Sequence, residues 1–106
     1  MFKLKRRPTL PGVILREDYL KPRRISVAAL AEALGCSRKH LSQIVNGRVR
    51  LEPEIAARLA RVFGTSTRFW INLQANVDAY DAERATRKWK PSATYRVAAA
   101  NPAARQ

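Results

Sequence analysis

The chain has 106 residues, of which 46% are hydrophobic, and glycine and proline are few. This length and composition predict one folded domain and exclude both a disordered polymer and a two-domain protein. No apolar run approaches the roughly 20 residues that cross a bilayer, and no long apolar segment follows the basic N-terminus, so we expect neither a membrane span nor a signal peptide. The single cysteine, Cys36, excludes an intrachain disulfide, which agrees with a cytoplasmic location.

The formal net charge is +13, from 21 basic and 8 acidic residues. Such an excess attracts polyanions, most often nucleic acid, with an acidic protein or a membrane surface as alternatives. Residues 1–24 contain eight basic and two acidic residues, and residues 54–106 contain nine and four, whereas residues 25–53 contain only four and two. The two ends of the chain therefore supply most of the non-specific attraction.

Residues 1–10 are predicted to form a basic, extended arm, because Pro8 disfavours a helix just before it. A Pro-Gly pair then precedes the first helix, which we expect over residues 13–20. Pro22 is predicted to stop this helix, since the residue before a proline is pushed out of the helical region. The residues expected to face inward are Ile14, Leu15 and Tyr19.

The stretch from Ser26 to Asn46 contains two helical patterns that meet at Gly35. Gly35 can adopt the left-handed conformation that ends a helix, and Ser37 is a good N-cap for the next one. This is the layout of a helix-turn-helix, whose second helix is presented to DNA. The apolar sides of the two helices are predicted to be Val27, Leu30, Ala31 and Leu34 in the first, and Leu41, Ile44 and Val45 in the second.

Two more helices are predicted after this motif, separated by Gly64. Pro53 suits the first turn of the fourth helix, and the fifth can extend to about Trp89. The expected fold is therefore all-α: a five-helix, Cro/repressor-like helix-turn-helix domain over residues 11–90, with an extended C-terminal helix. Residues 91–106 are expected to be a loosely held tail. The apolar stripes of these two helices are Ile55, Leu59, Val62 and Phe63, then Phe69, Trp70, Leu73, Val77 and Tyr80.

The sequence offers few groups for catalysis or metal binding. His40 is the only histidine and its neighbours are basic, so no His–carboxylate relay is predicted. One histidine and one cysteine without a carboxylate cluster do not predict a metal site, and no glycine-rich phosphate motif occurs. Asp78 and Asp81 are interpreted as solvated or ion-paired. We expect no enzyme activity, no metal and no cofactor.

The second helix of the motif carries the side chains that we predict to read bases. Arg38 and Lys39 lie at its N-terminal end, and Gln43 lies one turn further on the same side. Arg and Lys can bind guanine, and Gln can bind adenine, in the major groove. Most polar helix faces are only solvated, but the preceding helix, the glycine turn and the Asn-Gly that follows favour DNA reading here. Predicted contacts to the DNA backbone are Ser37, Ser42, Asn46, Arg48 and Arg50, and His40 is either a partly buried filler or a DNA contact.

Two further segments flank this motif: Pro11-Gly12-Val13-Ile14-Leu15-Arg16-Glu17 and Phe69-Trp70-Ile71-Asn72-Leu73-Gln74. Together with the motif, over about residues 8–82, the chain resembles the HigA-type antitoxins of the Xre/Cro-like helix-turn-helix superfamily. The two flanking segments are the most specific part of the resemblance. The family usually has His where Leu10 stands and Glu where Val13 stands.

The resemblance implies a bacterial cytoplasmic antitoxin of a type II toxin–antitoxin system. Such a protein neutralises a cognate HigB-type toxin, a RelE-like ribonuclease that cuts messenger RNA on the ribosome, and represses its own operon at a palindromic operator. It also implies a homodimer paired through the C-terminal helices, which fits the two-fold interface that a palindrome requires. The predicted dimerisation residues are Leu73, Val77 and Tyr80, with Phe69 and Trp70 in the monomer core.

The sequence also leaves alternative hypotheses about toxin docking and function. The resemblance suggests that the toxin docks near the N-terminal helix, with Tyr19 as a candidate contact. An alternative function is a stand-alone Xre-family transcriptional repressor without a toxin partner. A third, which rests only on the charge, is a basic RNA- or ribosome-associated protein.

Overall fold

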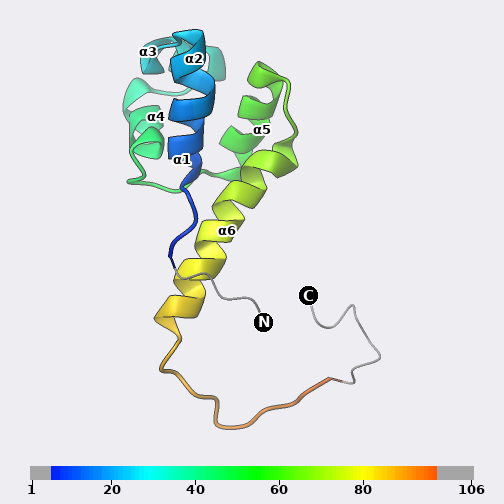
Figure 1. Ribbon diagram of the computed structural model, residues 1–106. Coiled ribbons are helices and arrows are strands. Elements are labelled where there is room, and N and C mark those ends of the chain that lie inside the picture. Colours follow the sequence, from blue (N-terminus) through cyan, green and yellow to red (C-terminus); the bar gives the residue numbers. More distant parts are fainter. Residues whose placement is uncertain (1–5, 98–106) are drawn as a thin grey trace.

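The computed structural model describes residues 6–97, and within this part the chain forms helices and no strands (Figure 1). The first helix is built from three consecutive segments, after which four separate helices follow, so the described part has the predicted five-helix, all-α architecture. Residues 1–5 of the predicted arm and residues 98–106 of the predicted tail lie outside the described residues. The elements are α1 (Pro11–Ile14), the π-helical η1 (Leu15–Leu20), α2 (Lys21–Arg23), α3 (Val27–Leu34), α4 (Arg38–Val45), α5 (Pro53–Phe63) and α6 (Thr67–Ala85).

The first helix does not stop before Pro22, so that prediction was wrong. It continues through α2 and ends where Arg24 adopts a left-handed conformation with φ 55°. Pro22 has no N–H to donate to the carbonyl oxygen of Asp18, and the guanidinium of Arg23 replaces it, with Nη1 3.1 Å from that oxygen. The wide η1 turn precedes the proline, as expected where a helix must accommodate an interruption of its hydrogen bonds.

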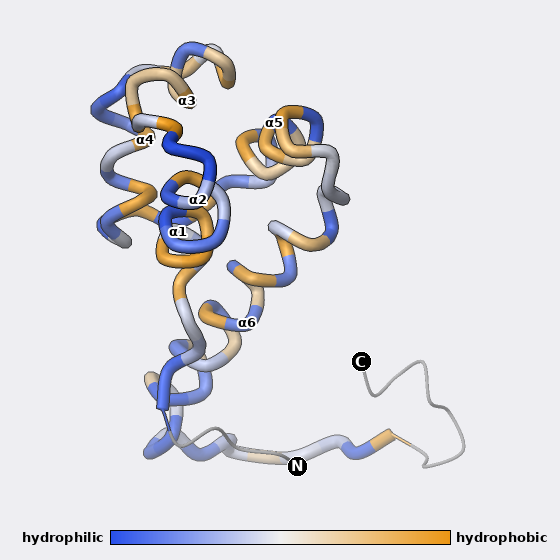
Figure 2. Tube along the Cα trace, turned by 45° about the horizontal axis from the view of Figure 1, so that its top comes forward, coloured by the Kyte–Doolittle hydropathy of each residue, from blue (hydrophilic) through white to orange (hydrophobic). Residues whose placement is uncertain are grey.

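The hydrophobic core lies where α3, α4 and α5 meet the first helix and the start of α6. Figure 2 shows hydrophobic positions gathered in this region. Trp70 is 0% exposed, and its indole Nε1 donates a hydrogen bond to Thr65 Oγ1 at 2.7 Å, so the polar edge of the ring is satisfied. The predicted core stripes are largely confirmed, but Val62 and Phe69 are 41% and 37% exposed. The largest fully buried side chains are Trp70, Leu15, Leu30, Leu41, Leu59 and Val77.

Local capping explains where α3, α4 and α6 begin. Ser26, Ser37 and Ser66 each accept a hydrogen bond at 3.0 Å from a main-chain N–H three residues later, which satisfies one of the free donors of a helix N-terminus. The N-cap predicted at Ser37 is therefore confirmed, and Ser26 and Ser66 cap their helices in the same way. Gly35 ends α3 with φ 75°, as the helix-turn-helix interpretation requires.

The helix α6 ends at Ala85, four residues before the predicted end at about Trp89. At this point the hydroxyl of Thr86 donates to the carbonyl oxygen of Ala82 at 2.9 Å. A threonine side chain that bonds the preceding turn competes with the next main-chain N–H, and this favours an end to the helix. All described residues from 81 to 97 are exposed. Figure 1 shows the chain after Ala85 leaving α6 at the end that lies away from the other helices.

Candidate nucleic-acid interface

The orientation of α4 is set by what its other face buries. Leu41, Ile44 and Val45 are at most 5% exposed and pack into the core, which leaves the polar side of the helix outward. Arg38 and Lys39 are exposed, and neither makes an ion pair with any of residues 6–97. They stand in the first turn of α4, where the free N–H groups and the helix dipole also favour an anion.

Gln43, the third predicted base-reading residue, is half-buried on the second turn of α4. It lies four residues after Lys39, so the two side chains share one side of the helix. The structure therefore brings the three predicted base-reading residues together on one short helix. Their contacts with bases stay a prediction.

The predicted backbone contacts near α4 already take part in local hydrogen bonds. The Ser37 hydroxyl accepts from the His40 main-chain N–H, and the Ser42 hydroxyl accepts from Asn46 Nδ2 at 3.2 Å. Each hydroxyl is only an acceptor in these bonds, so its own hydrogen can still be donated to a phosphate oxygen. Arg48, in the loop after α4, is exposed.

A close approach of two main chains positions α4 against the first helix. A Cβ on Gly12 would lie 2.2 Å from the carbonyl oxygen of Ile44 and 2.7 Å from that of Val45. Only a glycine can therefore stand there without moving α4. This contact gives a physical reason for the Pro-Gly pair, which sequence reasoning noted as a motif without a role.

His40 links the start of α4 to the start of α5. Its Nε2 lies 3.0 Å from Oε1 of Glu52, the N-cap residue of α5. The ring is half-buried, and its pairing with Glu52 favours a packing role over the alternative of a DNA contact.

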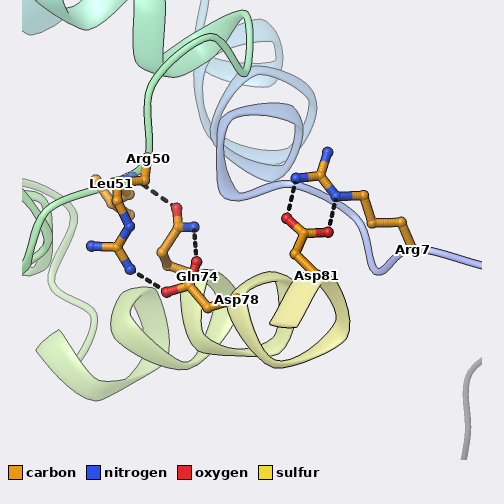
Figure 3. A network of polar contacts seen from close by, with 6 residues as sticks. All are labelled: Arg7, Arg50, Leu51, Gln74, Asp78 and Asp81. Carbon is orange, nitrogen blue, oxygen red and sulfur yellow. Dashed lines mark hydrogen bonds and ion pairs between the residues drawn. The ribbon is translucent and has the colours of Figure 1, made fainter. Parts of the chain in front are cut away.

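The loop after α4 is attached to α6 by a polar network that sequence reasoning missed (Figure 3). The main-chain N–H of Leu51 donates to Gln74 Oε1 at 2.7 Å, and Gln74 Nε2 donates to Asp78 Oδ1 at 2.9 Å. Asp78 also pairs with Arg50. The only sequence signal for this network was the glutamine that closes the Phe-Trp-x-Asn-Leu-Gln segment.

The basic arm before the first helix is attached to α6 as well. Arg7 donates two hydrogen bonds to the Asp81 carboxylate, from Nε at 3.0 Å and from Nη2 at 2.7 Å. These hydrogen bonds raise the pKa of Arg7 above its ordinary value. Asp78 and Asp81 are thus ion-paired, as one of the two interpretations expected. The arm, the loop and α6 together line a groove with a volume of about 260 Å³.

The predicted dimerisation residues occupy different environments. Val77 is 1% exposed within a single chain, so it belongs to the monomer core and has no surface to offer a second copy. Leu73 and Tyr80 are half-buried, and their role in dimerisation stays a prediction. Phe69, expected in the monomer core, is instead partly exposed.

Tyr19, the candidate toxin contact, is half-buried in an aromatic cluster that joins the first helix to α5 and α6. Its ring centroid lies 5.1 Å from that of Phe63 and 5.0 Å from that of Trp70. The guanidinium of Arg23 lies over the Tyr19 ring at 5.2 Å. Packing between the helices thus explains the position of the Tyr19 side chain.

Residues 6–97 offer neither a membrane span nor a metal site. The helices among them are too short or too polar to cross a bilayer. The same residues contain no group of three or more His, Cys, Asp or Glu side chains that could hold a metal ion.

Comparison with known proteins places the motif in a family. A family model described as "Helix-turn-helix" matches residues 17–70. The chain is 42% identical over 81 residues to antitoxin HigA-1 of Vibrio cholerae, which covers 76% of each chain. It is 43% identical over 83 residues to the HTH-type transcriptional regulator YbaQ of Escherichia coli, which covers 78% of this chain and 74% of the relative.

Solved structures resemble both the fold and the sequence. The antitoxin HigA of Pseudomonas aeruginosa, solved with the higBA promoter, has a TM-score of 0.74 at 41% identity and covers 77% of this chain and 89% of its own. The antitoxin GraA in complex with its operator has a TM-score of 0.79 at 34% identity and covers 93% and 100%. Since the family model, a relative 42% identical over three quarters of the chain and the fold all agree, the chain belongs to the HigA-type antitoxins of the Xre-like helix-turn-helix family.

Proposed function

We propose that this chain is the antitoxin of a type II toxin–antitoxin system. As a homodimer it binds a palindromic operator and represses its own operon, and by protein–protein binding it neutralises a HigB/RelE-like toxin that cuts messenger RNA. Its place of action is the cytoplasm, and its role is binding rather than catalysis. The observation that carries the proposal is the outward polar face of α4, in a fold that related antitoxins share in structures solved with promoter or operator DNA.

The geometry of α4 supports the DNA-binding half of the proposal. An α-helix fits the major groove, and Arg38 and Lys39 lie exposed at the N-terminal end that would enter it first. A two-fold dimer would present two copies of α4 about 34 Å apart, one turn of DNA, which is the spacing that a palindrome offers. The network that ties the loop after α4 to α6 would hold this spacing, provided that α6 pairs the two protomers.

Family membership supports the toxin-binding half. HigA-1 of Vibrio cholerae is named an antitoxin, and the match to it extends over three quarters of each chain. The specific segments on both sides of the helix-turn-helix lie in the first helix and in α6, away from the base-reading face of α4. They favour an antitoxin over the stand-alone Xre-family repressor, because the resemblance to the HigA-type antitoxins is most specific in these two segments.

The proposed operator binding can be tested with DNA from the region upstream of the gene. We expect the purified protein to bind a duplex from that region at least a thousandfold more tightly than a scrambled duplex of the same composition at physiological salt, a ratio on the order found for specific DNA-binding proteins. Fluorescence anisotropy at two salt concentrations measures both affinities. Equal affinity for the two duplexes would contradict autorepression. Tight binding to RNA of any sequence, without a preferred duplex, would favour the RNA-associated alternative.

Co-expression tests the toxin half. The small reading frame next to the gene is expressed from an inducible promoter, with and without this chain, and growth is followed. We expect growth arrest that this chain relieves, and a stable complex of the two proteins on gel filtration. Operator binding without any rescue of growth would instead support the stand-alone repressor.

A further inference from the structure

Arg50 stands at a junction between the proposed DNA interface and α6. It lies in the loop that follows α4, its side chain is 56% exposed, and it pairs with Asp78 of α6. Figure 3 shows one terminal guanidinium nitrogen facing Asp78 and the other pointing away from it. The nitrogen that bonds Asp78 is Nη2, and neither Nε nor Nη1 bonds any of residues 6–97. Arg50 therefore has donors left for a second acceptor.

The carboxylate that holds Arg50 is itself held in place. Its Oδ1 accepts a hydrogen bond from Gln74 Nε2 at 2.9 Å, and Gln74 Oε1 accepts from the Leu51 main-chain N–H at 2.7 Å. Gln74 is 7% exposed, and it is the one buried polar side chain among the described residues. The network thus begins at the side chain of Arg50 and returns to the main chain of its neighbour. The two hydrogen bonds of Gln74 thus fix the position of the Asp78 carboxylate relative to the loop.

Stability alone does not account for this arrangement. An ion pair as exposed as that of Arg50 and Asp78 contributes little to folding, because solvent screens it and two side chains must be ordered. The same ordering is useful in binding, since an arginine that is already oriented loses less conformational entropy when it meets a phosphate. Arginine is a common donor to phosphate oxygens, and such contacts fix the position of a protein on the duplex.

We propose that Asp78, held by Gln74, is a positioning residue that orients Arg50 toward the DNA backbone. Asp78 does not contact DNA in this arrangement, and it acts only through Arg50. The inference rests on the proposed function, because it requires that α4 bind operator DNA. It assigns to α6 a part in DNA binding that is separate from dimerisation.

The direction in which one substitution changes DNA affinity distinguishes a positioning role of Asp78 from a simple effect of its charge. Asp78→Asn removes a negative charge, which by itself would strengthen binding to DNA. Asparagine keeps an oxygen that can accept from Gln74, but it no longer pairs with the arginine as a charge. If Asp78 positions Arg50, the Asp78→Asn variant therefore binds operator DNA more weakly than the wild type, although its net charge is more positive.

The experiment measures operator and scrambled-duplex affinity between 50 and 200 mM salt for four proteins: wild type, Asp78→Asn, Arg50→Gln and the double variant. We expect Asp78→Asn to weaken operator binding roughly fivefold, the scale of one hydrogen bond. Its salt slope should flatten by up to about 0.9, the value of one phosphate contact. In the Arg50→Gln background the same substitution should cause no further loss.

The matched control is Glu83→Gln, which makes the same change of charge on α6. Glu83 is exposed, and its carboxylate has no ion pair within residues 6–97, so operator affinity should stay equal or rise slightly. Thermal unfolding of every variant separates weaker binding from loss of fold.

Three outcomes would overturn the proposal. Stronger binding by Asp78→Asn would mean that Asp78 restrains Arg50, and unchanged binding would mean that the pair has no role at the DNA. If Asp78→Asn lowered operator affinity as much in the Arg50→Gln background as in the wild type, Asp78 would act independently of Arg50. A wild-type protein without operator preference would instead refute the proposed function, and this inference with it.

Discussion

Gly12 and Ile44 meet main chain to main chain, and this contact holds the first helix against the C-terminal end of α4. A Cβ on Gly12 would stand 2.2 Å from the Ile44 carbonyl oxygen, closer than any real contact of such atoms. This oxygen belongs to the main chain of α4, so it cannot rotate away as a side-chain atom would. Any residue other than glycine must therefore displace one of the two helices.

Gly12→Ala is accordingly expected to lower the free energy of unfolding by about 3 kcal/mol, the upper end of the usual cost of overpacking. Because α4 must shift, operator affinity should fall as well. Chemical denaturation measures the first effect. Gly64→Ala is the comparison, since a Cβ at Gly64 meets nothing within 4 Å and only its φ of 71° opposes the change. It should cost about 1 kcal/mol, and equal losses for the two variants would contradict a steric role for Gly12.

Two side chains on α4 are expected to set sequence preference. Arg38→Ala and Gln43→Ala should each cost about 1–3 kcal/mol of binding free energy against the operator and relax the base preference at one position. Competition binding with operators substituted at single positions measures the effect. If Arg38→Ala leaves discrimination between operators unchanged, the base-reading face of α4 has been assigned wrongly.

Arg48 is expected to contact a phosphate rather than a base. It is exposed in the loop after α4, and its guanidinium has no ion pair among residues 6–97. Arg48→Ala should weaken binding to all duplexes alike and flatten the dependence of log affinity on log salt by about 0.9. Titrations of operator and scrambled duplexes over a range of salt test this. A loss confined to the operator would instead indicate base contact.

Gln74 is expected to matter for stability through its bond to the loop. Gln74→Leu would leave the buried N–H of Leu51 without its acceptor, and it should lower the free energy of unfolding by about 1–3 kcal/mol. Asn76→Leu, an exposed position on the same helix, serves as the control and should change it by less than about 0.5 kcal/mol. Similar values for the two substitutions would show that the hydrogen bond to the loop adds nothing.

The proposed boundary of the folded domain can be tested by truncation. All described residues from 81 to 97 are exposed, so a chain that ends at Lys90 should melt within about 3 °C of the full chain. A chain that ends at Tyr80 also lacks Asp81, the partner of Arg7, together with the last turn of α6, and it should melt lower. A large loss on truncation at Lys90 would place residues 91–106 within the folded domain.

Several features of this protein follow from the sequence alone, because they depend on interactions between residues close in the chain. The serine caps at Ser26, Ser37 and Ser66 act over three residues, and the left-handed turn at Gly35 depends on a single backbone conformation. Hydrophobic spacing of three and four residues is likewise local. These patterns were sufficient to predict the helices, the motif and the outward face of α4.

Other features depend on residues that only the fold brings together. Arg50 and Asp78 are 28 residues apart, and nothing in the local pattern of either indicates the other. Val77 and Phe69 belong to the same apolar stripe of α6, yet Val77 is enclosed in the monomer while Phe69 stays partly exposed.

The passage of the first helix through Pro22 is a third such case, because it depends on a side chain that replaces a missing main-chain donor. Local preference predicts a break because the residue before a proline is disfavoured in the helical region, yet Lys21 is helical with φ −59° and ψ −48°. The guanidinium of Arg23 bonds the Asp18 carbonyl, which the proline cannot. The sequence by itself thus determined the number and order of the helices and the family to which the chain belongs, but not every helix end. The tertiary structure alone decided which residues of the α6 stripe are enclosed in the monomer and how α6 is tied to the loop after α4, since both depend on contacts between distant parts of the chain.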